Sequence, residues 1–246
     1  MALIYLGMIL YKYMNQKWID LFKEQGILRI QLLKNYQNSI NNRQDTNETL
    51  SKYTNDKNKR TVLRQEDLNK LPKSNVVVEL NGGYIIAEPK SSFEYGVSLP
   101  SPLVFSTSTV FDKKFMGKFS TDGFFTIKDK DNFGLSLLKA IQKHHFVGIY
   151  CFDTVDYVLE KDLRVNEPVN RNFKIIRWKP GQIFNLTILG KMFGNYFCKE
   201  KMSKIDGKII NYEEEKEFRF AFLTEEPPEN GYIDIYCPEA LEFVEF

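Results

Sequence analysis

The alternation of aromatic and charged positions makes residues 211–222 the clearest structural signal in the chain. In the second half of this segment, phenylalanines occupy every second position and face away from the residues between them: Phe218, Phe220 and Phe222 against Glu217, Arg219 and Ala221. A period of two predicts a strand with one buried face. We expect the aromatic side to pack into a core, while Glu215 and Glu217 project together from the opposite side at the start of the strand.

A strand–helix–strand pattern opens the chain. Residues 9–14 read as a strand, Asn15 is a candidate helix cap, and a helical spacing of apolar residues continues to about Glu24. The apolar stripe of this helix consists of Trp18, Leu21 and Phe22. Gly26 ends the helix, and residues 27–33 form a second strand.

A long polar segment, residues 35–59, comes next. It is rich in Asn, Gln, Thr and Lys, which predicts a loop or lid with a short helix near 48–53. A modest basic run follows: Arg60, Arg64, Lys70 and Lys73. Residues 76–80 and 84–87 flank Asn81-Gly82-Gly83, and a turn centred on Asn-Gly predicts a hairpin.

The rest of the chain is predicted to consist of strands and a second helix. The helix covers 132–143, with an apolar stripe of Phe133, Leu137, Leu138 and Ile141. Strands are expected at 103–111, 123–127, 145–152, 173–178 and 232–237, with a short helix after the last, whereas 183–197 mixes both signals. Because we find no internal repeat and no clear linker, we predict one mixed α+β domain over residues 1–246, with a mainly antiparallel sheet and few helices.

Composition and charge narrow the function classes. Twenty Phe and thirteen Tyr against two Trp favour a β-rich interior, since aromatic side chains suit pleated surfaces. The 34 basic and 32 acidic residues leave a net charge of +2. This balance supplies no global attraction to nucleic acid or to a membrane, so any polyanion site must be a local patch.

The cysteines and the first ten residues indicate the compartment. Cys151, Cys198 and Cys237 are odd in number and far apart, so no disulfide framework is expected. No CxxC motif or His/Cys cluster offers metal ligands at the usual spacing. The apolar segment 1–10 is short, lacks a basic n-region and a cleavage site, and is interrupted by Lys12. We interpret it as a buried opening strand of a cytoplasmic protein with no membrane partner.

Three features follow one another in an order that resembles the R-S-E class of ADP-ribosyltransferases. They are an arginine on an early strand, a Ser-Thr-Ser segment on a middle strand and a Glu-x-Glu on a late strand: Arg29, Val104-Phe105-Ser106-Thr107-Ser108, and Glu215-Lys216-Glu217. The resemblance implies an ADP-ribosyltransferase-like fold with NAD as substrate. The plainer alternatives are a strand with exposed hydroxyls and a solvated charge run.

The resemblance also implies a role for each motif residue. In that class the arginine holds the NAD phosphates, a task suited to its fork of donors. The first serine orients the catalytic glutamate, and the last glutamate stabilises the oxocarbenium-like cation as nicotinamide leaves. Carried over by position, these residues are Arg29, Ser106 and Glu217, with Glu215 steering the acceptor. The remaining NAD contacts would be Thr107 and Ser108, with Tyr11 or Tyr13 stacking on nicotinamide.

A second resemblance covers more of the chain and involves an uncharacterised bacterial family. The shared segments are Leu10-Tyr11-Lys12-Tyr13, Trp18-Ile19, Leu28-Arg29-Ile30, Asp45-Thr46-Asn47-Glu48, Ile149-Tyr150-Cys151-Phe152 and Tyr212-Glu213-Glu214-Glu215-Lys216-Glu217-Phe218-Arg219. Members are often encoded near mobile elements and phage-defence genes and have been suspected of a distant ADP-ribosyltransferase relationship. The resemblance implies a toxin or phage-defence effector that modifies nucleic acid or protein and can have an antitoxin partner. An acceptor would dock on the basic run at 60–73.

Two other hypotheses stay open. The Asn-Asp-Pro-Phe-Glu box of that family is degenerate here, and the Trp-x-His-Tyr after Cys-Phe is missing, which favours a non-enzymatic binding or adaptor module. A metal-dependent nuclease would use four acidic residues: Asp45, Glu48, Glu215 and Glu217. His144 or His145 at the end of the second helix is a candidate base, although a helix C-terminus also favours histidine through its dipole.

Overall fold

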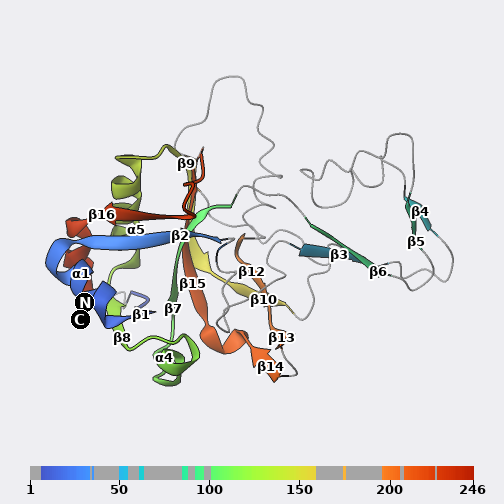
Figure 1. The fold of residues 1–246 in the computed structure, drawn as a ribbon, viewed down its shortest axis with the longest axis horizontal. Coiled ribbons are helices and arrows are strands. Elements are labelled where there is room, and N and C mark those ends of the chain that lie inside the picture. Colours follow the sequence, from blue (N-terminus) through green and yellow to red (C-terminus); the bar gives the residue numbers. More distant parts are fainter. Residues whose placement is uncertain are drawn as a thin grey trace, which may run out of the picture.

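A mainly antiparallel sheet forms the centre of the computed structural model (Figure 1). The structure describes residues 7–33, 35, 101–158, 196–205, 208–224 and 226–246, and short strands at 50–54, 61–63, 85–87, 92–96 and 174–175. The nine strands of the sheet, in chain order, are β1 (Leu10–Met14), β2 (Ile27–Leu32), β7 (Leu103–Ser108), β8 (Gly123–Ile127), β9 (Val147–Thr154), β11 (Lys174–Ile175), β15 (Glu217–Thr224), β16 (Tyr232–Tyr236) and β17 (Val244–Glu245). With few helices among the described residues, the fold is mixed α and β, as predicted.

The sheet divides into two branches at β7. Its main path runs β11-β9-β15-β7-β1-β8-β17, and β2 also joins β7 and carries β16. On one side β7 pairs with β15 over its whole length. On the other side it pairs with β2 at Val104 and Leu103, and with β1 only at Ser108. The two branches therefore separate from the same edge of β7.

Helices and aromatic side chains cover one face of the sheet. The helical elements that contribute to this core are α1 (Gln16–Gln25), α5 (Lys130–Gln142) and the 3₁₀ helix η2 (Pro238–Phe243). Helix α4 (Lys114–Lys118) and the 3₁₀ helix η1 (Glu213–Glu215) lie outside it. Phe105, Phe133 and Phe220 are buried in this core, with ring centroids 5.6–6.2 Å apart. Phe218 and Phe222 belong to the same core. The prediction that the phenylalanines of β15 pack into the core is thus confirmed. The expectation of only one buried face was wrong, because the residues between them are buried as well.

Short two-stranded sheets complete the described structure. They are β3 (Leu50–Thr54) with β6 (Ser92–Gly96), β4 (Thr61–Leu63) with β5 (Ile85–Ala87), β10 (Asp156–Val158) with β12 (Cys198–Glu200), and β13 (Met202–Ile205) with β14 (Lys208–Asn211). The pair β10–β12 is parallel. Figure 1 shows the first two pairs on the right, away from the main sheet. No helix in the described ranges has the length and apolar character needed to cross a membrane.

Most predicted elements have a counterpart in the structure, and two details were wrong. The helix expected near 48–53 is contradicted, because 50–54 is strand β3 paired with β6 some 40 residues later in the chain. Local composition could not reveal that partner. In α1 the buried side chains are Ile19 and Phe22, while Trp18 is only half-buried. Asn15 occupies the N-cap position, but its side chain makes no capping hydrogen bond.

Three other sequence predictions meet the limits of the described residues. For the predicted hairpin, 76–80 lies outside them, and 85–87 pairs with β4. The strand expected at 103–111 ends at Ser108. Of the opening segment 1–10, residues 1–6 lie outside the described part, and Met8 and Ile9 are exposed rather than buried.

Gly26 provides a test of the junction between α1 and β2. It has a φ of 67°, and a Cβ atom there would lie 2.9 Å from Cα of Pro238. We expect Gly26→Ala to lower the free energy of unfolding by about 1–3 kcal/mol, because the left-handed backbone and the contact with η2 both oppose a side chain. Chemical denaturation measures this change.

The matched control is Gly117→Ala in α4, where a Cβ atom would meet nothing within 4 Å. That variant should be unchanged or more stable by up to about 1 kcal/mol, since alanine is the better helix former. Equal losses in the two variants would contradict the assigned backbone conformation of Gly26.

Candidate functional site

The register of three neighbouring strands gathers the sequence motifs on one face of the sheet. Ser108 of β7 pairs with Tyr11 of β1 on one side and with Glu217 of β15 on the other. Two residues back, Ser106 pairs with Arg219. Directly paired residues point to the same side of a sheet, so these side chains share the face opposite to the phenylalanine core.

This face contains a pocket that opens to solvent. It is lined by residues from five parts of the chain: Tyr11, Lys12, Tyr13, Ser106, Thr107, Ser108, Phe119, Lys199, Glu215, Glu217 and Arg219. Seven of the eight site residues chosen from the sequence are in this lining. The exception is Arg29.

A buried ion pair forms the inner wall of the pocket. Arg219 Nε lies 2.7 Å from Glu217 Oε1, and Nη2 lies 3.1 Å from Oε2, so the guanidinium grips both carboxylate oxygens. The relative exposure is 2% for Arg219 and 8% for Glu217. Arg219 Nη1 also donates to the carbonyl oxygen of Tyr196 at 2.6 Å. The fork geometry of arginine matches this arrangement.

The charge state of Glu217 follows from its neighbours. Burial by itself would raise the pKa of this carboxyl. The charges of Arg219 and Lys199, together with hydrogen bonds from Arg219 and Ser106, outweigh burial and lower the pKa from 4.5 to about 2. The backbone N–H of Glu217 donates to the hydroxyl of Tyr157 at 3.0 Å. Glu217 is therefore a fixed, ionised carboxylate.

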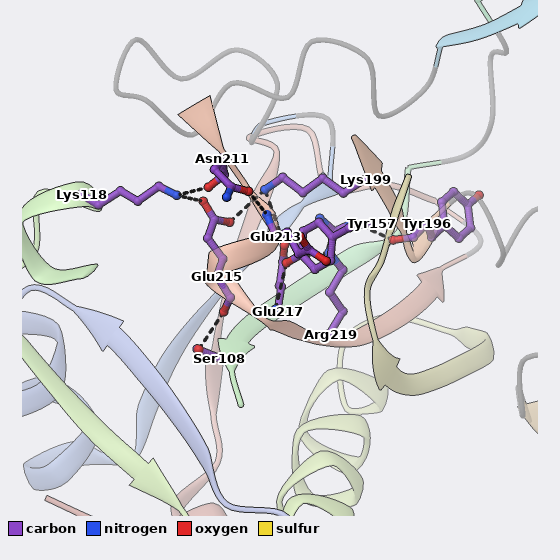
Figure 2. A network of polar contacts seen from close by, with 10 residues as sticks. All are labelled: Ser108, Lys118, Tyr157, Tyr196, Lys199, Asn211, Glu213, Glu215, Glu217 and Arg219. Atoms are coloured by element: carbon purple, nitrogen blue, oxygen red, sulfur yellow. Dashed lines mark hydrogen bonds and ion pairs between the residues drawn. The ribbon is translucent and has the colours of Figure 1, made fainter. Parts of the chain in front are cut away.

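The structure places Glu215 differently from the sequence prediction. It ends the 3₁₀ helix η1, and Lys216, with a φ of 44°, turns the chain before β15 begins at Glu217. Glu215 is nevertheless buried and faces the same pocket. The Ser108 hydroxyl donates to its carbonyl oxygen at 2.7 Å, which fixes the turn (Figure 2).

Two lysines from distant elements compensate the Glu215 carboxylate. Lys118 Nζ lies 2.9 Å from Oε1, and Lys199 Nζ lies 3.1 Å from Oε2. Lys199 also approaches Glu217 Oε2, at 3.6 Å. Figure 2 shows the resulting row of side chains, in which positive and negative groups alternate from Lys118 to Arg219.

Aromatic side chains form the wall opposite the charged row. Tyr13 is buried among four phenylalanine rings: Phe111, Phe115, Phe119 and Phe124. Its hydroxyl accepts the backbone N–H of Asp112 at 2.8 Å. Tyr13 therefore builds the wall, whereas the half-buried Tyr11 and Phe119 are more accessible to a ligand.

Arg29 is held elsewhere in the structure. Its guanidinium makes two 2.7 Å hydrogen bonds to Asp234 of β16, and it lies between the rings of Trp18 and Tyr232. The sequence hypothesis that Arg29 serves this pocket needs correction, because β2 leaves β7 on the other branch of the sheet. The arginine of the pocket is Arg219.

Several lining residues were missed from the sequence. Lys199 belongs to β12. It follows residues 183–197, for which the sequence predicted neither helix nor strand, and it is part of no recognised motif. Lys12 was visible in the opening strand but was not selected, and its Nζ donates to the carbonyl oxygen of Ser106 at 2.7 Å. Thr107, which was selected, donates to the carbonyl oxygen of Phe218.

The remaining candidates lie apart from the pocket or outside the described residues. Asp45 and Glu48 lie outside them, as does most of the basic run at 60–73. In the described part of the chain, no group of three or more His, Cys, Asp or Glu side chains could hold a metal ion. Cys151, Cys198 and Cys237 are buried free thiols. Burial raises the pKa of Cys237 to about 11, which keeps it protonated.

Comparison with known proteins returns no matching family model, no matching curated protein and no matching solved structure. The chemistry of the pocket must therefore be argued from its own geometry. That geometry combines the ionised Glu217, the neighbouring carboxyl group of Glu215, three cationic side chains and an aromatic wall.

The buried ion pair leads to a stability prediction. Arg219→Met leaves the Glu217 carboxylate buried without its main partner, so we expect the free energy of unfolding to fall by about 3–5 kcal/mol. Arg219→Met/Glu217→Gln should recover part of the loss, because the uncompensated charge is then absent. Lys128→Met, which breaks an exposed pair with Glu245, is the control and should cost at most about 1 kcal/mol. Additive losses in the double variant would show that the two side chains do not interact.

The low pKa of Glu217 leads to a prediction about acid stability. A carboxyl whose pKa is lower in the folded state stabilises the protein above its unfolded pKa, and this contribution disappears as the pH falls through the folded value. The stability difference between the wild type and Glu217→Gln should therefore shrink between about pH 4.5 and pH 2. Denaturation curves over this range measure it, and a constant difference would mean that folding does not lower the pKa of Glu217.

Proposed function

We propose that the protein is an NAD-dependent ADP-ribosyltransferase-like enzyme, a toxin or phage-defence effector whose acceptor is nucleic acid or protein. One observation supports this most. The Ser106-Thr107-Ser108 segment and the pair Glu215 and Glu217, more than 100 residues apart in the chain, line one pocket together with Tyr11. The order of the motifs along the sequence suggested the ADP-ribosyltransferase class. The serine and glutamate motifs also lie together in one pocket, as a shared active site requires.

The reaction breaks one bond and forms another at the same carbon. The glycosidic bond between C1′ of the ribose and the nicotinamide nitrogen breaks, and its electron pair neutralises the positively charged ring as nicotinamide leaves. The ribose carries the resulting oxocarbenium-like charge. An acceptor nucleophile then bonds to C1′ and loses a proton, and water in that place gives free ADP-ribose.

Glu217 would stabilise the developing positive charge. Its carboxylate is ionised and held by Arg219 and Ser106, so it needs no rearrangement when the charge appears. Ser106 would orient this carboxylate through the hydrogen bond between them. Tyr11, half-buried in the lining, would offer its ring to nicotinamide.

The charge of the lining suits the phosphates of NAD. Three cationic side chains, Lys12, Lys199 and Arg219, face the pocket with two carboxylates. The aromatic wall with Tyr11 and Phe119 suits the planar rings of the same ligand. These cationic side chains would bind the NAD phosphates, the role that the sequence hypothesis assigned to Arg29.

A binding or adaptor module is the second candidate. The observation that favours it is the engagement of both Glu217 oxygens by Arg219, as expected for a structural ion pair. Such a module would keep the fold and bind a partner without transferring ADP-ribose.

Thermal unfolding with and without millimolar NAD tests whether the pocket binds the dinucleotide. A ligand that binds only the folded state stabilises it, so we expect the midpoint to rise by several degrees at saturation. The rise should disappear in Glu217→Gln and remain in Arg29→Ala, whose side chain lies outside the pocket. Each variant is compared with its own midpoint without NAD.

Release of nicotinamide, with water or a labelled acceptor, tests the chemistry itself. We expect Glu217→Gln to lower the rate by about 100-fold or more, the size typical of losing one electrostatic stabiliser. Full activity in that variant would refute the proposed role of Glu217. Absence of both an NAD-dependent shift and nicotinamide release would favour the binding module.

A further inference from the structure

Lys199 is the basic residue that joins the two carboxylates of the pocket. It lies in β12, its relative exposure is 6%, and its Nζ is 3.1 Å from Glu215 Oε2 and 3.6 Å from Glu217 Oε2. The ammonium also lies 4.5 Å from the ring centroid of Tyr212. The parallel pairing of β12 with β10 brings it to this position.

Two buried carboxyl groups that face one pocket create an electrostatic problem. Like charges at close range favour protonation of one partner, and burial adds to that tendency. Here the acidic groups alternate with bases: Lys118, Glu215, Lys199, Glu217 and Arg219. Lys118 forms an ion pair with Glu215, and Arg219 forms one with Glu217. The central position belongs to Lys199.

We propose that Lys199 is a positioning residue that bridges Glu215 and Glu217 and holds the two carboxyl groups side by side in the pocket. This inference rests on the proposed function, because the pair is what would face the ribose and the acceptor. It adds a residue outside the motifs that suggested that function.

Other charged and titratable groups also face this pair. Lys118 comes from α4 and Arg219 from β15. Lys12 of β1 also lines the pocket, but its ammonium lies over the ring of Phe105 and donates to the carbonyl oxygen of Ser106. The Tyr157 hydroxyl of β10 lies at the backbone of Glu217, and both burial and the Glu217 charge raise its pKa, so it stays neutral. Lys199 forms ion pairs with both carboxylates.

Carbon-13 NMR of glutamate-labelled protein tests the inference directly. The Glu215 and Glu217 carboxyl signals are assigned with Glu215→Gln and Glu217→Gln. In Lys199→Met the titration midpoint of Glu217 should rise by about 1–3 pH units, the usual effect of losing an opposite charge at this distance. Lys199→Arg should keep it near the wild-type value of about 2.

Lys201→Met is the matched control, since Lys201 lies two residues further along and pairs with Glu213 at 2.6 Å. That variant should leave the Glu217 signal unchanged. The proposal is overturned if Lys199→Met leaves the Glu217 midpoint where it is, or if Lys201→Met moves it equally.

A double variant covers the case in which Lys199→Met does not fold. Lys199→Met/Glu215→Gln removes one charge of each sign and preserves the balance of the pocket. The midpoint of Glu217 should be lowest in Glu215→Gln, higher in the double variant and highest in Lys199→Met. Equal midpoints in Glu215→Gln and the double variant would refute a role for Lys199.

Nicotinamide release adds a functional readout that separates this inference from the proposed function. If the wild type releases nicotinamide, the acid limb of its pH profile should move toward neutral pH in Lys199→Met and recover in Lys199→Arg. An unmoved limb would count against the proposal. If the wild type releases none, the proposed function fails, and the NMR titration still decides the role of Lys199.

Discussion

The ion pair of Arg219 and Glu217 sets the conditions for the rest of the pocket. Both side chains are withdrawn from water, so each charge must be compensated within the protein. The partners come from separate elements: the carbonyl of Tyr196, the ammonium of Lys199 and the hydroxyl of Ser106. One charge balance therefore ties β15 to β7 and β12. Displacing any of these elements would separate a buried charge from its partner, which costs more free energy than a small shift of apolar side chains.

The branching of the sheet explains why the opposite wall is aromatic. Because β1 touches β7 only at its end, the chain after Ser108 folds over β1 and β8 and places Phe111, Phe115 and Phe119 around Tyr13. A second apolar cluster thus forms on the face opposite to the main core. The pocket lies between that apolar cluster and the row of charged side chains, so one of its walls is aromatic and the other is charged.

Local pattern was sufficient wherever a single strand or helix determined the outcome. The alternation in β15 predicted the buried phenylalanines, and the Asn15-to-Gly26 signals predicted α1. Pattern was insufficient where long-range partners decided. Arg29 looked suitable until Asp234, 205 residues later, became its cross-strand neighbour. Glu215 looked like a strand residue because a lysine with positive φ has no sequence signature. The position of Lys199 depends on the parallel pairing of β12 with β10, which the sequence of neither strand predicts.

The order of the pocket's parts along the chain has a consequence for biosynthesis. Tyr11 belongs to one of the first strands, while Lys199, Glu215 and Arg219 lie more than 180 residues later. Contacts of such sequence separation are slow to form, since a long loop must close before they are made. The nascent chain therefore cannot assemble the acidic pair with its bases until β15 has left the ribosome. The pocket therefore forms only after segments far apart in the chain have all been synthesised.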